Sequence, residues 1–354
     1  MNVPTEFLEL HGAPHKTPCI QYAFFTAEEM VFHFEKGFAD IGKRQNISAQ
    51  HTINAFSVTK TFTALAVLQL AIAGKFKISD PIKNWLPLLP YPDGISIAQL
   101  LYHSAGIPNP LPLNWIHLVS EHESFDRNAF FEKIFLKNQK VGSRPNEKYS
   151  YSNLGYVILG QLIEKVAELP YEKYIEEQII QKISVSPSDL GFIHPDGSIH
   201  ATGYQKQWSI INLLLGLFID KSKFTGKVEN AWLPFNYFYV NGTSYGGLIA
   251  SLNGLIKYAQ ALLQARNPFL SEEYFAMLFR ENKTNNGKST GMCCSWFSGS
   301  LKGVEYFCHA GGGGGYYCEI RLYPLIKRGS VVMFNRSGMS DERFLDRVDQ
   351  YFIR

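Results

Sequence analysis

Apolar and polar residues follow two patterns along this chain, and the patterns separate its ends from its middle. Short apolar runs broken by turns occur at 22–34 and predict the first strands of a sheet. From Ser57 to Gly74 the chain is rich in Ala and Leu and lacks proline, which predicts one buried helix that ends at the glycine. Runs that predict an antiparallel meander and a last helix return near the C-terminus, at 292–297, 304–308, 317–323, 330–334 and 341–353.

Helical spacing dominates the middle of the chain. Helices are predicted at 95–101, within 111–140, at 171–183 and from Tyr245 onward. Apolar residues also recur at helical spacing within 156–169, so Ser152 or Asn153 is expected to cap a core helix there. The stretch 210–219 is more apolar than its surroundings. We expect it to pack as a helix of this middle region, or to form an apolar wall of a substrate cleft.

The composition is that of an ordinary globular protein. Of 354 residues, 45% are hydrophobic and 18% are charged, and the net charge of +3 comes without a block of consecutive Lys and Arg, which argues against a nucleic-acid partner. No secretory signal is visible, and the longest apolar runs, 64–74 and 210–219, are shorter than the ~18 residues that cross a bilayer. We therefore predict a cytoplasmic protein without stable membrane insertion; nothing indicates its oligomeric state.

The five cysteines do not have the pattern of a disulfide scaffold. A zinc site is conceivable from one late group of residues, which consists of Cys293, Cys294, Cys308, His309 and Cys318. Because two of these cysteines are adjacent and C-x-x-C pairs are missing, small apolar cysteines in strands are favoured over metal ligands. We expect neither a metal nor a cofactor.

Candidate chemistry begins at the first turn of the helix at 57–74. Ser57 and Lys60 lie three residues apart, which places their side chains on one face of a helix, within reach of each other. Burial shifts an amine toward its neutral form, so Lys60 can take the proton of Ser57 and activate it as a nucleophile. The N–H of Ser57 at the helix N-terminus can stabilise an oxyanion. An S-x-x-K sequence also arises by chance, so its context has to support this hypothesis.

A second candidate group lies in the loop before the helix at 156–169. Tyr151 and Asn153 are two residues apart and can project to one side. If that side faces Ser57, the Tyr151 phenol can relay a proton between nucleophile and leaving group. Asn153 can then bind a substrate carbonyl and hold Lys60. The alternative is a core tyrosine beside a capping asparagine.

Two histidines precede glycines. We interpret His103, shortly before Gly106, as a buried hydrogen-bonding residue, with a catalytic base as the alternative. His309 precedes the glycines at 311–315. A strand rather than a G-K-[ST] helix follows them, so we favour a side-chain-free strand against which a substrate lies over a phosphate loop.

Three motifs occur in a fixed order along the chain: Ser57-x-x-Lys60, Tyr151-x-Asn153 and His309-x-Gly311. In this order they resemble the motifs of the serine β-lactamase and penicillin-binding superfamily, and most closely its branch of class C β-lactamases, DD-peptidases and esterases. Further segments that look like family landmarks are 79–81, 100–106, 154–156 and 245–248.

The resemblance implies an α+β fold of the β-lactamase/transpeptidase type. An antiparallel sheet flanked by helices would come from about 1–78 and 242–354, with a mainly helical lobe from about 79–241 inserted between them. The whole chain, 1–354, would then be a single catalytic domain.

The resemblance also implies roles for individual residues. Ser57 would be the acylated nucleophile, Lys60 its base partner, and Tyr151 the group that protonates the leaving group and assists deacylation. The N–H groups of Ser57 and Gly312 would form the oxyanion hole. The substrate-binding residues implied in this way are Asn153, His309, Gly311 and Gly312.

One departure from the family pattern concerns the substrate. His309 stands where many β-lactamases have a lysine, and a histidine that is largely neutral near pH 7 is a poorer anchor for a substrate carboxylate. We therefore expect a serine hydrolase that acts through an acyl-enzyme on a small ester, amide or D-amino-acid peptide, ahead of a true β-lactamase. A non-hydrolytic scaffold or ligand sensor with the same fold is the alternative from another class.

Overall fold

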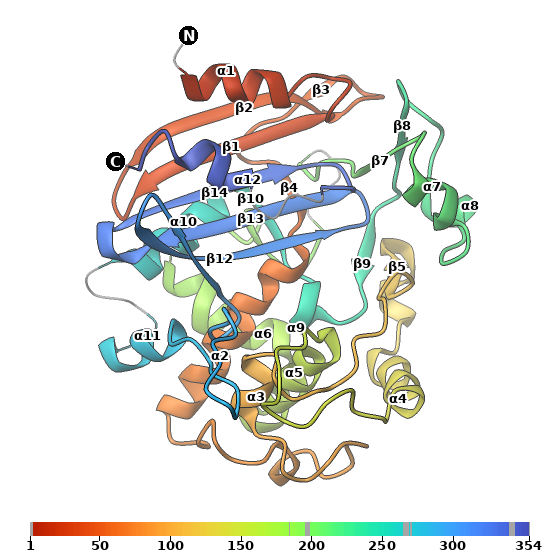
Figure 1. Ribbon diagram of the computed structural model, residues 1–354. Coiled ribbons are helices and arrows are strands. Elements are labelled where there is room, and N and C mark those ends of the chain that lie inside the picture. Colours follow the sequence, from red (N-terminus) through yellow and green to blue (C-terminus); the bar gives the residue numbers. More distant parts are fainter. Residues whose placement is uncertain are drawn as a thin grey trace.

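The computed structural model describes residues 3–183, 185–194, 199–264, 269, 271–339 and 344–353. Both ends of the chain join in one antiparallel sheet with the strand order β11-β12-β13-β14-β1-β2-β3 (Figure 1). Its strands are β1 (Cys19–Thr26), β2 (Met30–Asp40), β3 (Gln45–Asn46), β11 (Phe297–Leu301), β12 (Val304–Gly313), β13 (Tyr316–Tyr323) and β14 (Arg328–Phe334). Because β1 pairs with β14, the two N-terminal strands continue the sheet that the C-terminal strands form.

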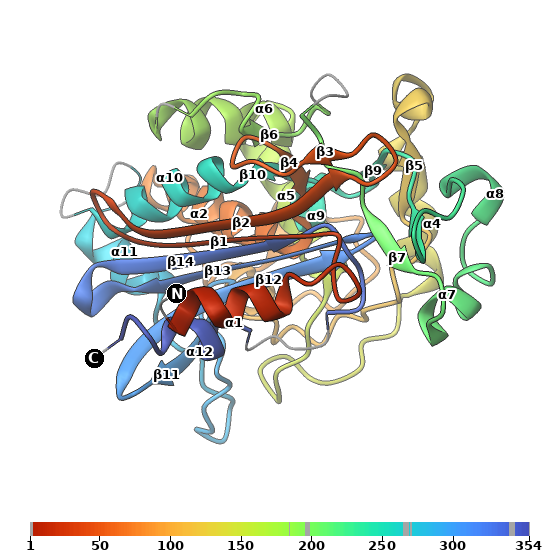
Figure 2. The ribbon, with the colours of Figure 1, turned by 90° about the horizontal axis from the view of Figure 1, so that it is seen from above.

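The sheet is covered on both faces. Helices α1 (Val3–His11) and α12 (Phe344–Asp349) lie on one face, and α10 (Leu252–Leu263) lies on the other (Figure 2). Strand β1 is buried throughout, and successive side chains point to opposite faces. Tyr22 thus packs in the cluster of α1 and α12, whereas Ala23 packs in the larger cluster with α10.

Helix α2 (Thr59–Ile72) connects the sheet region to the helices of the middle segment. The predicted helix at 57–74 is confirmed, with a 3-10 turn at Phe56–Val58 before it. Its Ala- and Leu-rich sequence is buried over almost its whole length, because α10 packs on one side and α5 (Asn153–Ala167) on the other. The helix ends at Ile72, and Gly74 stops the chain from continuing it, because its φ of +70° is left-handed and disfavours other residues.

The middle of the chain is largely helical, as predicted (Figure 1). Its main helices are α3 (Ile97–Leu101), α4 (Arg127–Lys137), α5, and α6 (Tyr171–Ile175), which continues through a π turn and a 3-10 turn to Ile183. Ser152 rather than Asn153 caps α5, since its hydroxyl accepts the N–H of Gly155 at 3.1 Å. The region 111–140 is only partly helical, because β5 (Ile116–Leu118) pairs there with β9 (Phe238–Val240).

Two boundaries differ from the predicted ones. The helix expected from Tyr245 is divided into α9 (Thr243–Gly246) and α10 by strand β10 (Ile249–Ser251), which pairs with β4 (Thr52–Asn54) and β6 (Leu190–Gly191). The predicted strand at 292–297 is wrong, because β11 begins only at Phe297. Cys294 lies in a buried loop instead, where its N–H donates to the carbonyl of Leu278 in α11 (Glu272–Leu278). Residues 341–343 of the last predicted helix lie outside the described part.

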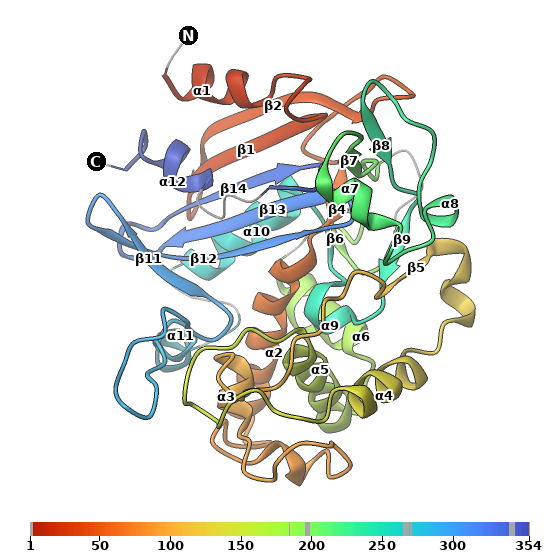
Figure 3. The same cartoon turned by 45° about the vertical axis from the view of Figure 1, so that its right-hand side comes forward.

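The stretch 210–219 does not pack as predicted. It forms α7 (Ile210–Leu215) and the turn before α8 (Lys221–Phe224), which stand out at one edge of the molecule beside β7 (Tyr204–Lys206) and β8 (Trp232–Pro234) (Figure 3). Ile210 and Leu213 are 78% and 81% exposed, whereas the polar Asn212 between them is buried. The expectation of a packed helix is therefore wrong for most of this stretch.

No helix among the described residues combines the length and the hydrophobicity that a bilayer-spanning segment requires. The division into a sheet lobe and a helical lobe near residues 78 and 242 stays a prediction, although all seven strands of the large sheet come from residues 19–46 and 297–334.

Candidate active site

The nucleophile candidate sits in a constrained turn. Phe56 has a φ of +45°, a left-handed conformation that is strained for an aromatic residue. Neighbours hold it there: the N–H of Ala55 donates to the carbonyl of Leu248 at 2.8 Å, and a Cβ on Gly313 would lie only 2.8 Å from the Phe56 ring. The turn brings Ser57 to the N-terminal end of α2, where backbone N–H groups lack helical partners.

Three side chains from two distant segments converge on one oxygen. The Ser57 hydroxyl accepts hydrogen bonds from Lys60 Nζ at 2.9 Å and from the Tyr151 phenol at 2.8 Å. Ser57 and Lys60 share the start of α2, and Tyr151 precedes α5, 94 residues later. The structure therefore brings together the three residues that the sequence proposed as catalytic.

Lys60 is fully buried, and its surroundings carry no opposite charge. Its amine donates to the backbone carbonyl of Tyr245 at 2.8 Å, and no carboxylate among the described residues forms an ion pair with it. Desolvation lowers the pKa of Lys60 well below its ordinary value of 10.5. Tyrosine rings lie 4.9 to 5.7 Å from the amine, and their attraction for an ammonium, about 0.5–2 kcal/mol, does not offset desolvation.

His103 is buried against Tyr151. Its ring stacks on that of Tyr151 with centroids 4.3 Å apart, and its Nδ1 accepts the N–H of Ser152 at 3.1 Å. The proton of a neutral ring is then on Nε2, which is buried without a partner. Burial lowers the pKa of His103 well below 6.5, and the nearby Lys60 lowers it further. This agrees with the interpretation of a buried hydrogen-bonding histidine.

Asn153 begins α5 and is buried beside the same loop. Its backbone N–H donates to the Asn109 side chain at 3.0 Å, and its side-chain oxygen has no hydrogen-bond partner. The expected contact between Asn153 and Lys60 is not formed, because the carbonyl of Tyr245 takes that place. An unpaired buried amide oxygen is costly, so the side chain is suited to a group supplied by a substrate.

His309 lies on β12 and is 1% exposed. Its Nδ1 contacts the backbone carbonyl of Ser295, and because a carbonyl only accepts, this nitrogen carries the proton and Nε2 is left as an acceptor. Burial lowers the pKa of His309 to about 3, with a smaller contribution from Lys60. The ring is therefore neutral at physiological pH, as expected from the sequence.

The glycines after His309 allow the backbone of β12 to touch the nucleophile turn. A Cβ on Gly311 would lie 2.0 Å from the carbonyl oxygen of Ala55 and 2.9 Å from the nitrogen of Ser57. Strand β11 pairs with β12 only as far as Cys308, so residues 309–313 have the Ser57 turn beside them instead of another strand. The side-chain-free part of β12 thus lies against the backbone of the nucleophile turn, where the sequence had suggested a substrate.

Tyr245 lies in the segment 245–248 that looks like a family landmark, but its contact with Lys60 was not predicted. It contributes through its backbone carbonyl, which any residue type provides, so side-chain chemistry carries no signal for it. Its segment is fixed from both sides: Thr63 donates to the carbonyl of Ser244 at 2.6 Å, and the N–H of Leu248 donates to Thr59 at 3.0 Å. A sequence signal exists only in the small residues around it, Gly246 and Gly247.

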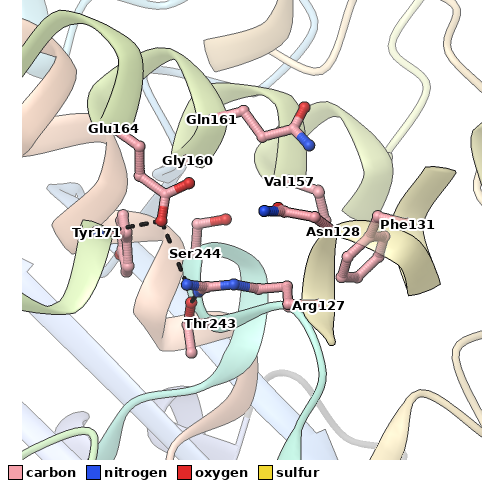
Figure 4. Close-up of a pocket in the computed structure, with 11 residues that line it drawn as sticks. Arg127, Asn128, Phe131, Val157, Gly160, Gln161, Glu164, Tyr171, Thr243 and Ser244 are labelled. Atoms are coloured by element: carbon pink, nitrogen blue, oxygen red, sulfur yellow. Dashed lines mark hydrogen bonds and ion pairs between the residues drawn. The ribbon is translucent and has the colours of Figure 1, made fainter. Parts of the chain in front are cut away.

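A separate pocket lies behind α9 and is lined by α4, α5 and α6 (Figure 4). Arg127 crosses it and contacts Thr243 together with two carboxylates, Glu172 at 2.6 Å and Glu164 at 3.3 Å. The charge of Arg127 is thus neutralised within the protein. These contacts fix Thr243, two residues before Tyr245, and so support the anchor of Lys60.

The cysteines have the environment of apolar side chains. Four of the five are buried, and burial raises the pKa of Cys294 to about 12 and that of Cys19 to about 12. In the described part of the chain, no group of three or more His, Cys, Asp or Glu residues is arranged to hold a metal ion.

The fold and this site define the class: an α+β domain of the β-lactamase/transpeptidase type with a serine hydrogen-bonded to a buried lysine. The chain belongs to the Beta-lactamase family, whose model matches residues 7–351. Penicillin-binding protein 4* of Bacillus subtilis (strain 168) is 25% identical over 317 residues, which are 87% of this chain and 66% of that protein. Protein flp of Staphylococcus aureus (strain N315) is 26% identical over 180 residues, or 49% of this chain and 35% of that protein. The chain thus spans less than two thirds of the length of either relative.

Solved structures share the fold at lower identity. A D-amino acid amidase from Ochrobactrum anthropi SV3 superposes with a TM-score of 0.78 at 16% identity and covers 99% of this chain and 97% of its own. A D-stereospecific amidohydrolase from Streptomyces superposes with a TM-score of 0.74 at 20% sequence identity. The match covers 99% of this chain and 98% of that protein. An octameric penicillin-binding protein homologue from Pyrococcus abyssi superposes with a TM-score of 0.76 at 23% sequence identity. The match covers 95% of this chain and 74% of that protein.

Proposed function

We propose that this protein is a serine hydrolase that acts through an acyl-enzyme, with Ser57 as nucleophile, Lys60 as base and Tyr151 as proton relay. The observation that carries the proposal is the Ser57 hydroxyl, which contacts both a fully buried amine at 2.9 Å and a phenol at 2.8 Å. An amine that burial keeps neutral has the free electron pair that a general base needs.

The proposed reaction has two halves. Lys60 takes the proton of Ser57 while the Ser57 oxygen attacks the substrate carbonyl. The hydrogen bond that Lys60 donates to the Tyr245 carbonyl holds the amine in position for this transfer. Tyr151 then donates a proton to the leaving group, and an ester between Ser57 and the acyl group remains. In the second half, water gives up a proton to the same groups and attacks this ester, which releases the acid and restores Ser57.

The N–H groups of Ser57 and Gly312 form the oxyanion hole in this proposal. Support comes from the contact of Gly311 with the backbone of Ser57, which brings β12 beside the nucleophile turn. Preorganised N–H donors of this kind contribute about 10²–10³-fold to the rate. Asn153, whose side-chain oxygen lacks a partner, is proposed to accept an N–H of the substrate.

The proposed substrate is a small ester, amide or D-amino-acid peptide. His309 is neutral and offers an acceptor nitrogen, which suits an amide N–H or an amine better than the carboxylate of a β-lactam. The D-amino acid amidase and D-stereospecific amidohydrolase that share the fold support amide substrates. A true β-lactamase is the runner-up; a non-hydrolytic scaffold is disfavoured by the intact contacts of Ser57.

Labelling with a fluorophosphonate tests the nucleophile. Mass spectrometry of the digested protein should find one adduct, on Ser57, in the wild type and in a control variant of an exposed serine, Ser300→Ala. The Ser57→Ala variant should not be labelled. An adduct on another residue, or none, would refute the mechanism.

A substrate panel tests the specificity. It contains chromogenic esters of different acyl length, D- and L-amino acid amides and a chromogenic cephalosporin. Turnover of esters or D-amides that Ser57→Ala abolishes supports the proposal. Preferred turnover of the cephalosporin would identify a β-lactamase instead, and acylation without any turnover would identify a sensor.

A further inference from the structure

Helix α7 buries its polar side chain and exposes its apolar ones. Asn212 points inward, where its side chain donates to the carbonyl of Gln207 at 2.7 Å and accepts from Lys221 Nζ at 2.9 Å. The Ser209 hydroxyl caps the helix by accepting the N–H of Asn212 at 3.1 Å. These bonds join residues 207–221 to one another and hold the polar side of the helix toward the inside of its own segment. Turning it to bury its leucines would break these bonds, so the apolar side faces outward in the folded protein.

The outward side forms an apolar patch of unusual size. Five of its side chains are more than half exposed: Trp208, Ile210, Ile211, Leu213 and Leu217. Leu214 and Phe218, each 44% exposed, extend it. Isolated apolar residues on a surface need no explanation, but a contiguous group of this size marks a site of interaction.

The charges around the patch are mainly positive. The segment 206–228 contains four lysines, Lys206, Lys221, Lys223 and Lys227, and one acidic residue, Asp220. Lys223 is paired with Glu121 at 2.6 Å, and Asp220 caps α8. Counting Glu121 and the adjacent Glu229 as well, four positive charges stand against three negative ones. Lys221 is turned inward to Asn212, so Lys206 and Lys227 are the exposed lysines beside the patch. Two copies of the chain that met through this patch would bring their lysines together, whereas an anionic surface would match them.

The composition and shape fit the surface of a bilayer. Large aliphatic side chains with a tryptophan among them and lysines beside them are typical of segments that lie in the membrane interface. Helices α7 and α8 lie at the outer edge of the molecule (Figure 2). No bilayer-spanning helix is needed for this mode of binding.

We propose that the patch of residues 208–218 docks the protein on an anionic lipid bilayer, with Trp208, Leu213 and Leu217 entering the interface and Lys206 and Lys227 contacting lipid phosphates. Tyr204, four residues before the patch, donates its N–H to the carbonyl of Gly315, in the turn that follows the glycines of β12. The inference is independent of the proposed hydrolase activity.

Vesicle co-sedimentation of the full chain tests this proposal. Vesicles of phosphatidylcholine with about one third phosphatidylglycerol should bind the protein at about 0.1 M salt, and binding should weaken on raising the salt to about 0.5 M. Vesicles of phosphatidylcholine alone should bind on the order of tenfold less. Trp208 emission should shift to the blue on binding. The Trp208→Phe variant should lose that shift, because the other tryptophans, Trp85, Trp115, Trp232 and Trp296, are less exposed.

Paired variants separate docking from folding. Leu213→Glu with Leu217→Glu should reduce the partition coefficient on the order of tenfold or more, since both side chains would enter the interface. The control pair is Leu88→Glu with Leu325→Glu, at positions 96% and 78% exposed outside the patch, and should bind as the wild type does. Equal melting temperatures establish that all variants fold. Equal binding by the two pairs, or no binding of the wild type to anionic vesicles, overturns the proposal. A self-associated species in light scattering that only the patch variant loses also overturns it and assigns the patch to a second copy.

Discussion

Within the described residues, Lys60 and Arg321 are the two cations whose side chains are fully buried, and their surroundings differ completely. Arg321 on β13 contacts Glu319 at 2.9 Å and Asp346 of α12, and its guanidinium lies 3.8 Å from the Tyr306 ring. Lys60, on the other side of the sheet, has only a hydroxyl, a carbonyl and aromatic rings.

The difference in partners sets the charge of each group. Burial by itself lowers the pKa of Arg321, but the carboxylates of Glu319 and Asp349 raise it above its ordinary value, so the guanidinium stays charged. No such carboxylate opposes the desolvation of Lys60, and its pKa falls. Burial therefore produces a base only where the fold leaves out the counter-charge.

The first prediction removes the unpaired amine. In Lys60→Met, kcat/KM for an ester should fall about 10³-fold, because the general base is lost. The free energy of unfolding at pH 7 should not fall. Lys60 binds its proton more weakly in the folded protein than in the unfolded chain. Below pH 10.5 this difference reduces the free energy of unfolding of the wild type, which therefore rises with pH. Rate assays and thermal denaturation check both parts; a large loss of stability would mean that the amine is charged and paired.

The second prediction removes the paired cation. Arg321→Met leaves Glu319 buried without its ion-pair partner, and the free energy of unfolding should fall by about 3–5 kcal/mol. The rate per active site, counted by fluorophosphonate labelling, should stay at the wild-type value. A loss of rate per labelled site would contradict the assignment of Arg321 to stability alone.

The third prediction leaves both cations in place and alters the backbone contact beside Ser57. In Gly311→Ala the new Cβ would lie 2.0 Å from the carbonyl of Ala55, so β12 has to move away and the oxyanion hole widens. We expect kcat to fall about 10²-fold, with an unchanged pH profile. Gly94→Ala is the control, because a Cβ there meets open space. An unchanged kcat for Gly311→Ala would remove β12 from the mechanism.

The smallest expected effect concerns pH. The wild-type kcat/KM should rise with pH through one limb, as Lys60 loses its proton, with a pKa well below 10.5. His309, with a pKa of about 3, stays neutral and should add no limb near neutrality. In His309→Glu a carboxylate would stand near the amine, raise the pKa of Lys60 and move the limb up by about one unit. His309→Gln is the uncharged control; an identical shift in both variants would show that the charge is not the cause.

Local sequence patterns predicted much of the fold and the reacting residues. The helix at 57–74, the cap of α5 by Ser152 and the strands β12 to β14 follow from short-range spacing and capping chemistry. Ser57 and Lys60 were found because both lie on one helical turn. Tyr151 was a candidate from its own loop, but only the resemblance to a family implied that it meets Ser57, since no local pattern indicates which distant loop does so.

The rest depended on tertiary context. The apolar run 292–297 has the composition of a strand, but its backbone groups bond to α11 and to each other, which no local pattern contains. The exposure of α7 was not predicted because hydrophobicity normally indicates burial, and the inward bonds of Asn212 depend on its neighbours in space. The carbonyl of Tyr245 carries no residue-specific signal.

Gly311 has a consequence for how this protein can diversify. Beside Ser57 the main chain of β12 lies directly against the main chain of the nucleophile turn, and a side chain added at Gly311 collides with the Ala55 carbonyl. A mutation that adds a side chain at Gly311 therefore moves β12 away from the nucleophile turn. Substitutions that change the substrate preference, in evolution or in a designed library, are therefore expected in other segments, such as the loops around α4 and β9.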